Sequence, residues 1–183
     1  MVFSNILVPF DDSEHAHAAL HLAIDLVGSD PGATIHIVTV ASNDIMPPSM
    51  LTATGAFGEA PIDYASYETL LTSIAERSDR ELHDNVAAIL GKDIDAVKAK
   101  LVIDTRLAPS PVDGITCYAA DHRCDLIIMG RRGLGALRGM LGSVSYGVLR
   151  SSEIPVLTVK SRPALQVKAR RAHAIRSTPT LAR

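Results

Sequence analysis

Short apolar runs alternate with longer amphipathic segments through most of this sequence, and that alternation constrains the fold more than any single residue does. The apolar runs have the length of β-strands, whereas the segments between them repeat apolar residues at helical spacing. We predict strands at residues 6–9, 34–40, 97–103, 126–129 and 155–159. Strands separated by helices lie parallel and are joined by right-handed crossovers. The sequence therefore predicts an α/β fold: a doubly wound, open five-stranded parallel sheet with helices on both faces, of the Rossmann-like type.

Capping residues mark where the predicted helices begin. Either Asp12 or Ser13 can cap the first helix, which ends before Gly28. Ser110 is followed by Pro111, a combination that favours an N-cap and a first helical residue. The predicted helices cover residues 14–27, 62–91, 111–122 and a segment that begins at Ser143.

The chain divides into one predicted domain at residues 1–160 and a basic C-terminal tail at residues 161–183. The tail carries six basic residues and no acidic one, which leaves a net charge of -8 for the domain. Its apolar residues form no strong stripe, so we expect disorder or a loosely docked helix, with a basic arm for nucleic acid or acidic lipid as the alternative. Residues 41–61 contain proline and glycine without a clear period and predict a long connection that acts as a lid.

Composition and local patterns argue against several function classes. The formal net charge is -2, so nucleic acid is an unlikely partner of the whole chain. The sequence has no signal peptide, and no apolar run approaches the roughly 20 residues of a membrane span. Its cysteines, Cys117 and Cys124, form no CxxC pair. We therefore expect a cytoplasmic protein without a membrane partner. We interpret His17 and His21 as solvated residues rather than metal ligands. No catalytic constellation is recognisable, so we predict a protein that is not an enzyme, with slow turnover as the alternative.

A glycine-rich connection links the fourth predicted strand to the last helix. It contains five of the chain's twelve glycines, Gly130, Gly133, Gly135, Gly139 and Gly142. Backbone N–H groups at glycines can approach a ligand closely, and the following helix N-terminus favours an anion. The connection therefore indicates a phosphate cradle, with a flexible turn as the alternative. Arg131, Arg132 and Arg138 could approach phosphates there, although exposed arginines are more often only solvated.

Four blocks of the sequence together resemble the universal stress protein family. They lie at residues 5–15, 125–133, 141–145 and 154–157. The nucleotide-binding branch of that family carries the pattern G-x2-G-x9-G-[ST], and Gly130, Gly133, Gly142 and Ser143 match its fixed positions. The spacing between Gly133 and Gly142 is one residue shorter here.

The resemblance implies a binding site for ATP or another adenine nucleotide, with or without Mg²⁺. Because the glycine loop is shorter, ADP and AMP stay open as alternatives to ATP. Asp11 and the backbone of Val40 would face adenine, although Asp11 could instead act only as a helix cap. The family layout places Gly130 at the ribose and puts the other three pattern residues at the phosphates. The expected cofactor-binding residues are Pro9, Phe10, Asp11, Val40, Met129, Gly130, Gly133, Gly142, Ser143 and Val144.

The same resemblance implies a sensor or regulator in the stress response that works as a homodimer. We expect dimerisation through the edge strand at residues 156–159, whose outer backbone groups have no partner within an open sheet. The alternative is a dimeric interaction scaffold of the same family that binds no nucleotide.

Overall fold

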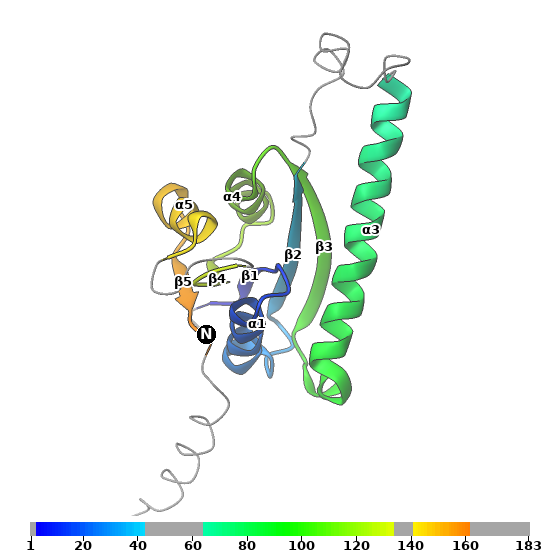
Figure 1. Ribbon diagram of the computed structural model, residues 1–183. Helices are drawn as coiled ribbons and strands as arrows, with labels where there is room; N and C mark the ends of the chain where they lie inside the picture. Colours follow the sequence, from blue (N-terminus) through cyan, green and yellow to red (C-terminus); the bar gives the residue numbers. More distant parts are fainter. Residues whose placement is uncertain (1–2, 43–63, 134–140, 162–183) are drawn as a thin grey trace, which may run out of the picture.

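The fold is a five-stranded parallel sheet with the strand order β3-β2-β1-β4-β5, flanked by helices (Figure 1). The computed structural model describes residues 3–42, 64–133 and 141–161. The strands are β1 (Asn5–Pro9), β2 (Thr34–Ser42), β3 (Lys100–Ala108), β4 (Leu126–Gly130) and β5 (Val156–Val159). The helices are α1 (Glu14–Val27), α3 (Tyr64–Leu90), α4 (Pro111–Asp121) and α5 (Ser143–Ser151), with a 3-10 helix, η1 (Gly91–Ala96). The predicted doubly wound sheet is confirmed.

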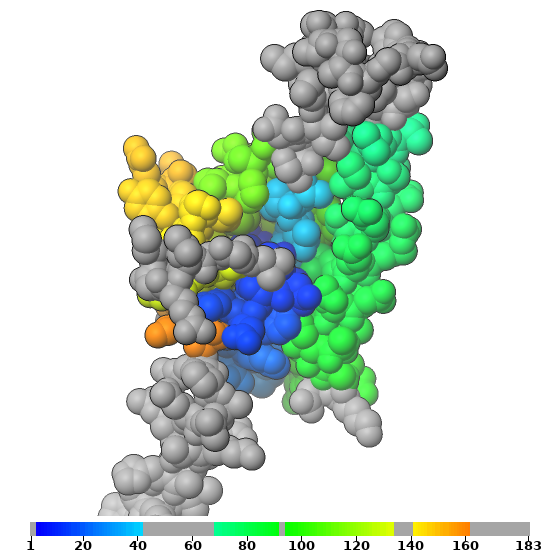
Figure 2. Space-filling view, in the orientation of Figure 1, coloured from blue at the N-terminus to red at the C-terminus, as the bar shows by residue number. Residues whose placement is uncertain are grey.

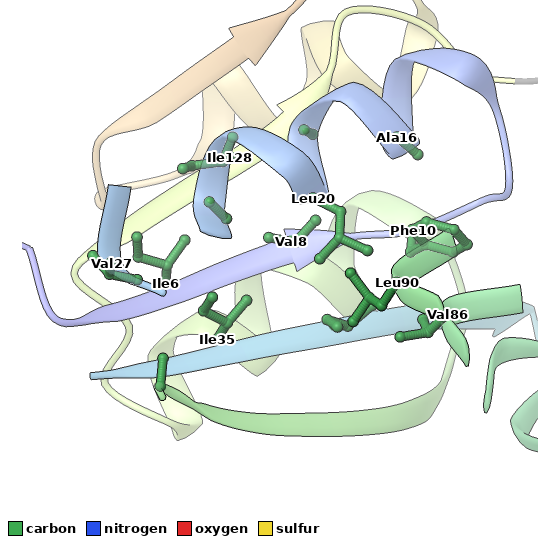
Figure 3. Packing of buried hydrophobic residues seen from close by; sticks show 14 of the residues in the cluster. Ile6, Val8, Phe10, Ala16, Leu20, Val27, Ile35, Val86, Leu90 and Ile128 are labelled. Carbon is green, nitrogen blue, oxygen red and sulfur yellow. The ribbon is translucent and has the colours of Figure 1, made fainter. Parts of the chain in front are cut away.

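Helices cover both faces of the sheet, and each face has its own apolar core. Leu20 of α1 and Val86 of α3 pack over Ile6, Val8 and Ile35 of β1 and β2 (Figure 3). On the opposite face, α4 and α5 cover a second cluster, which includes Leu7, Val38, Ile115, Tyr118, Ile127 and Val148. Each fully buried side chain of this size contributes about 1.5–3 kcal/mol to folding. Figure 2 shows α3 along one flank of the molecule and α5 with β5 at the other.

Polar side chains set the start of α1. Ser13 is the N-cap, and its hydroxyl accepts a hydrogen bond from the Ala16 N–H at 3.2 Å. The Asp11 carboxylate accepts from the Ser13 hydroxyl at 2.6 Å and from the Ser13 N–H at 3.2 Å. Of the caps that the sequence left open, Ser13 is therefore the one used, and Asp12 adopts a positive φ of 59° in the turn.

The third strand differs from its predicted bounds. The sequence predicted residues 97–103, but β3 begins at Lys100 and continues to Ala108. Asp104, Thr105 and Arg106 interrupt the apolar pattern, yet each pairs in register with a residue of β2. Pairing with a neighbouring strand therefore outweighs local composition at this sheet edge. The remaining strands, and the described helices, lie within a few residues of their predicted positions.

Two predicted segments lie largely outside the described residues. The expected lid at residues 41–61 overlaps the described chain only at its first two positions, where β2 ends. The basic tail overlaps it only at Ser161. Both expectations stay predictions.

A polar network is buried at the opposite end of the sheet from the glycine-rich connection. His36 of β2 is 7 % exposed, with Nδ1 3.1 Å from the Tyr118 hydroxyl and Nε2 3.0 Å from Asn5 Oδ1. The Asn5 amide nitrogen donates to the carbonyls of His122 and Arg123, so Asn5 Oδ1 is an acceptor and His36 Nε2 carries the proton. His36 Nδ1 then accepts from Tyr118, and the neutral imidazole satisfies both partners.

This network predicts how stability depends on pH. Burial lowers the pKa of His36, His122 and Lys100 lower it further, and Asp104 opposes them. The unfolded chain therefore takes up a proton below about pH 6.5 that the folded chain does not. As the pH is lowered, this group reduces the free energy of unfolding by at most about 1.4 kcal/mol per pH unit. We expect His36→Gln to flatten this part of the decline when urea unfolding is measured between pH 7.5 and 5.

The exposed His21 supplies the matched control, because His21→Gln removes a histidine without touching the network. An unchanged pH slope in His36→Gln would contradict the assignment of this decline to His36.

Candidate functional site

A pocket of about 590 Å³ opens at the carboxyl ends of the central strands. It lies between β1 and β4, where the strand order reverses: the connection from β1 leads to β2 on one side, whereas the connection from β3 leads to β4 on the other side. Doubly wound sheets bind ligands at such a switch point. The volume falls within the range of small-molecule sites, about 300–1,000 Å³.

Every residue predicted for the cofactor site lines this pocket. They are Pro9, Phe10, Asp11, Val40, Met129, Gly130, Gly133, Gly142, Ser143 and Val144. They come from the ends of β1, β2 and β4 and from the start of α5, segments that are far apart in the sequence. The geometry therefore brings the predicted set together in one place.

The pocket also has lining residues that the sequence analysis did not assign to the site. They are Ala16, Val38, Thr39, Pro111, Ile115, Arg132, Leu141 and Ser145. Spacing could have indicated some of them, because Val38 precedes Val40 by two residues on a strand and Ile115 follows Pro111 by four on a helix. Of the arginines considered for phosphates, Arg132 lines the pocket, Arg131 does not, and Arg138 lies outside the described residues.

The two ends of the pocket differ in chemistry. Val38, Val40 and Ile115, together with Met129, give one end an apolar surface. At the other end, α5 begins at the N-cap Gly142, a residue without a side chain that could cap the helix. The first turn of a helix has N–H groups without intrahelical partners, and its dipole favours an anion. A ligand with an uncharged ring at one end and an anionic group at the other would match these two parts of the pocket.

Asp11 takes part in the turn before α1 and also lines the pocket. One carboxylate oxygen is held by Ser13, as described above, and the other lies against Gly133, where an added Cβ would collide with it. Ser13 is the N-cap and Asp11 supports it through two hydrogen bonds, so a structural role of Asp11 in the turn stays open beside a role in binding. The glycine at position 133 lets the glycine-rich connection approach this carboxylate.

Gly130 is the point at which two helix N-termini meet the end of β4. A Cβ on Gly130 would lie 2.8 Å from His15 Cβ and 3.0 Å from the Ala16 nitrogen, so α1 packs directly on this backbone. The buried Ser145 hydroxyl of α5 donates to the Gly130 carbonyl at 2.9 Å. The Thr39 hydroxyl donates to the Phe10 carbonyl at 2.8 Å and ties β2 to the end of β1. These contacts fix the backbone that surrounds the pocket.

Other candidate chemistry lies outside the pocket. His17 contacts Asp12 at 2.8 Å and stacks on Phe10, and the described residues contain no group of three side chains that could hold a metal ion. Cys117 is exposed, whereas Cys124 is buried, and burial raises the pKa of its thiol to about 11. Within the described part of the chain, no helix is long and apolar enough to cross a membrane.

Comparisons with known proteins agree with this fold. The sequence model of the Universal stress protein family matches residues 3–160. The structure of hypothetical protein MJ0577 is similar at a TM-score of 0.63 and 24 % identity, covering 90 % of this chain and 100 % of that one. Universal stress protein UspA from Lactobacillus plantarum gives a TM-score of 0.63 at 21 % identity, covering 87 % and 99 %. A universal stress protein in complex with cAMP gives 0.52 at 21 % identity, covering 88 % and 100 %. A comparison with curated proteins found no match.

The close approach at Gly130 predicts a contrast between two glycines of the pocket. Gly130→Ala places a methyl group against backbone and Cβ atoms of α1, and we expect a loss of about 1–3 kcal/mol in unfolding free energy. Gly142→Ala has its nearest contact at 3.2 Å, the Arg132 Cα, so we expect a smaller loss, under about 1 kcal/mol. Urea unfolding of both variants measures the difference, and equal losses would show that α1 does not depend on Gly130.

Proposed function

Because the chain belongs to the universal stress protein family, we propose that it binds an adenine nucleotide in the switch-point pocket and acts as a sensor or regulator in the stress response. The observation that carries the proposal is the convergence of all the predicted residues on one pocket with an apolar end and an anion-favouring end. A structural relative solved in complex with cAMP supports an adenine nucleotide as the ligand class.

The proposed ligand lies along the pocket. Adenine occupies the apolar end beside Val40 and Asp11, where the backbone at the end of β2 and the carboxylate supply hydrogen bonds. The ribose lies over Gly130. The phosphates lie at Gly133, Gly142 and Ser143, where the first turn of α5 donates N–H groups. ATP is the first choice, and the shorter glycine loop keeps ADP and AMP as alternatives.

The proposal assigns binding rather than catalysis. Among the described residues that line the pocket, Asp11 and Arg132 are the ones with charged side chains, and no histidine or cysteine is present. The Asp11 carboxylate is held by Ser13 and has no second acid–base group beside it among the described lining residues, so the pocket offers no acid–base pair there. Mg²⁺ would enter with the phosphates of a bound nucleotide.

We also propose a homodimer formed through the free edge of β5. The Pro155 and Val159 carbonyls accept from Ile127 and Arg131 of the β4 segment, so the backbone groups of Val156 and Thr158 face the other side, away from β4. Leu157 is 40 % exposed and offers apolar area beside that edge. A dimeric scaffold without nucleotide would use the same edge, so the ligand distinguishes the two functions.

Titration of ATP, ADP and AMP by calorimetry tests the binding proposal. We expect Gly142→Val to abolish binding, because a branched side chain beside the Arg132 Cα, where a Cβ would already lie at 3.2 Å, displaces the backbone around the first turn of α5. Ser143→Ala removes one hydroxyl and is expected to cost about 1–1.5 kcal/mol, or roughly tenfold in affinity. If the shorter glycine-rich loop leaves too little space for three phosphates, AMP or ADP will bind as tightly as ATP.

Ser151→Ala is the matched control, since it removes a hydroxyl from the other end of α5. Circular dichroism shows whether each variant remains folded. A parent protein that binds none of these nucleotides at millimolar concentration overturns the proposal in favour of the scaffold.

Val156→Pro tests the proposed dimer edge. Proline removes the outward N–H of residue 156 while leaving the hydrogen bond between Ile127 and Pro155 in place. We expect the parent to sediment as a dimer at micromolar concentration and the variant as a monomer. A parent that is monomeric, or a variant that dimerises equally well, would count against this edge.

A further inference from the structure

Two glycines inside the helices of one layer have no role in a turn or a cap. Gly114 is in the second turn of α4 and is buried, and Gly147 is in the middle of α5. Glycine in a helix interior is about 1 kcal/mol less favourable than alanine. A packing contact that excludes a methyl group would explain each of them.

The first glycine lies against a residue of the pocket wall. A Cβ on Gly114 would lie 2.6 and 2.9 Å from the two γ-carbons of Val40, and 3.1 Å from the Ala108 Cβ. Val40 lines the pocket, as do Pro111 and Ile115 on either side of Gly114 along α4. The missing side chain therefore lets Val40 recede toward α4 and lets α4 lie close to β2.

The second glycine repeats this arrangement between two helices. A Cβ on Gly147 would lie 2.6 Å from Val112 Cγ2 and 3.4 Å from Val112 Cγ1. Val112 belongs to α4, one residue after Pro111, and Gly147 belongs to α5, whose first turn lines the polar end of the pocket. The two contacts form a series in which β2 packs on α4 and α4 packs on α5.

We propose that Gly114 and Gly147 are positioning residues that set the width of the pocket separately at its two ends. Gly114 sets the apolar end through Val40, and Gly147 sets the position of α5, and so the polar end, through Val112. Valine has few χ1 rotamers, so a methyl group at either glycine moves the valine or the helix by several tenths of an ångström. This inference rests on the proposed function, because it concerns the affinity of that same pocket.

Calorimetry with adenosine and with ATP separates the two ends. Gly114→Ala is expected to lower the affinities for adenosine and for ATP by the same factor, at least tenfold, because both ligands carry the base. Gly147→Ala is expected to weaken ATP at least tenfold and to leave adenosine within twofold, because only ATP reaches the first turn of α5. A general loss of structure would not produce this split.

Paired substitutions supply a rescue. Gly114→Ala combined with Val40→Ala makes room for the new methyl group, and we expect it to bind adenosine within threefold of Val40→Ala alone. Gly147→Ala combined with Val112→Ala is expected to restore ATP binding in the same way. Rescue identifies the contact between glycine and valine as the cause, even where the single variants are less stable.

The outcomes distinguish this inference from the proposed function. A parent that binds neither ATP nor adenosine overturns the proposed function, and with it this inference. If the parent binds both ligands, three results overturn the inference alone. In the first, the glycine variants bind as tightly as the parent, and in the second, Gly147→Ala weakens adenosine binding as much as ATP binding. The third result is that the added valine substitutions restore no binding.

Discussion

The packing of α1 directly on the backbone of Gly130 is the contact on which the pocket depends. His15 and Ala16 approach this glycine more closely than any side chain would allow, and Ser145 of α5 bonds to its carbonyl. Two helix N-termini are therefore held at the end of one central strand. Since β1 and β4 are buried along their central residues, the position of that strand end is fixed by both apolar cores.

Much of the fold could be predicted because the signals are local. Strands that alternate with helices specify a parallel sheet, and Ser110 followed by Pro111 marks the start of α4. The extent of β3 could not be predicted, since Asp104 to Arg106 join the sheet only through pairing with β2. The network of His36, Tyr118 and Asn5 joins residues of three separate elements, and no spacing in the sequence indicates it.

That these residues line one pocket was predictable for a related reason. The pattern glycines and Asp11 follow strands, and the carboxyl ends of parallel strands gather at one edge of the sheet. The resemblance to the family indicated which of these residues to select as candidate binding residues. The sequence did not indicate why Gly114 and Gly147 are glycines, because the opposing side chains, Val40 and Val112, are known only once the helices have been packed. The pocket thus combines a predictable set of residues with an unpredictable set of close contacts.

Mass spectrometry of small molecules released from the freshly purified and then denatured protein tests the central claim most directly. If the switch-point pocket is an adenine-nucleotide site, the extract should contain ATP, ADP or AMP at close to one molecule per chain, and the species recovered identifies the number of phosphates. Recovery of no adenine nucleotide, from protein shown to be folded before denaturation, would contradict the account and favour a scaffold with the same fold.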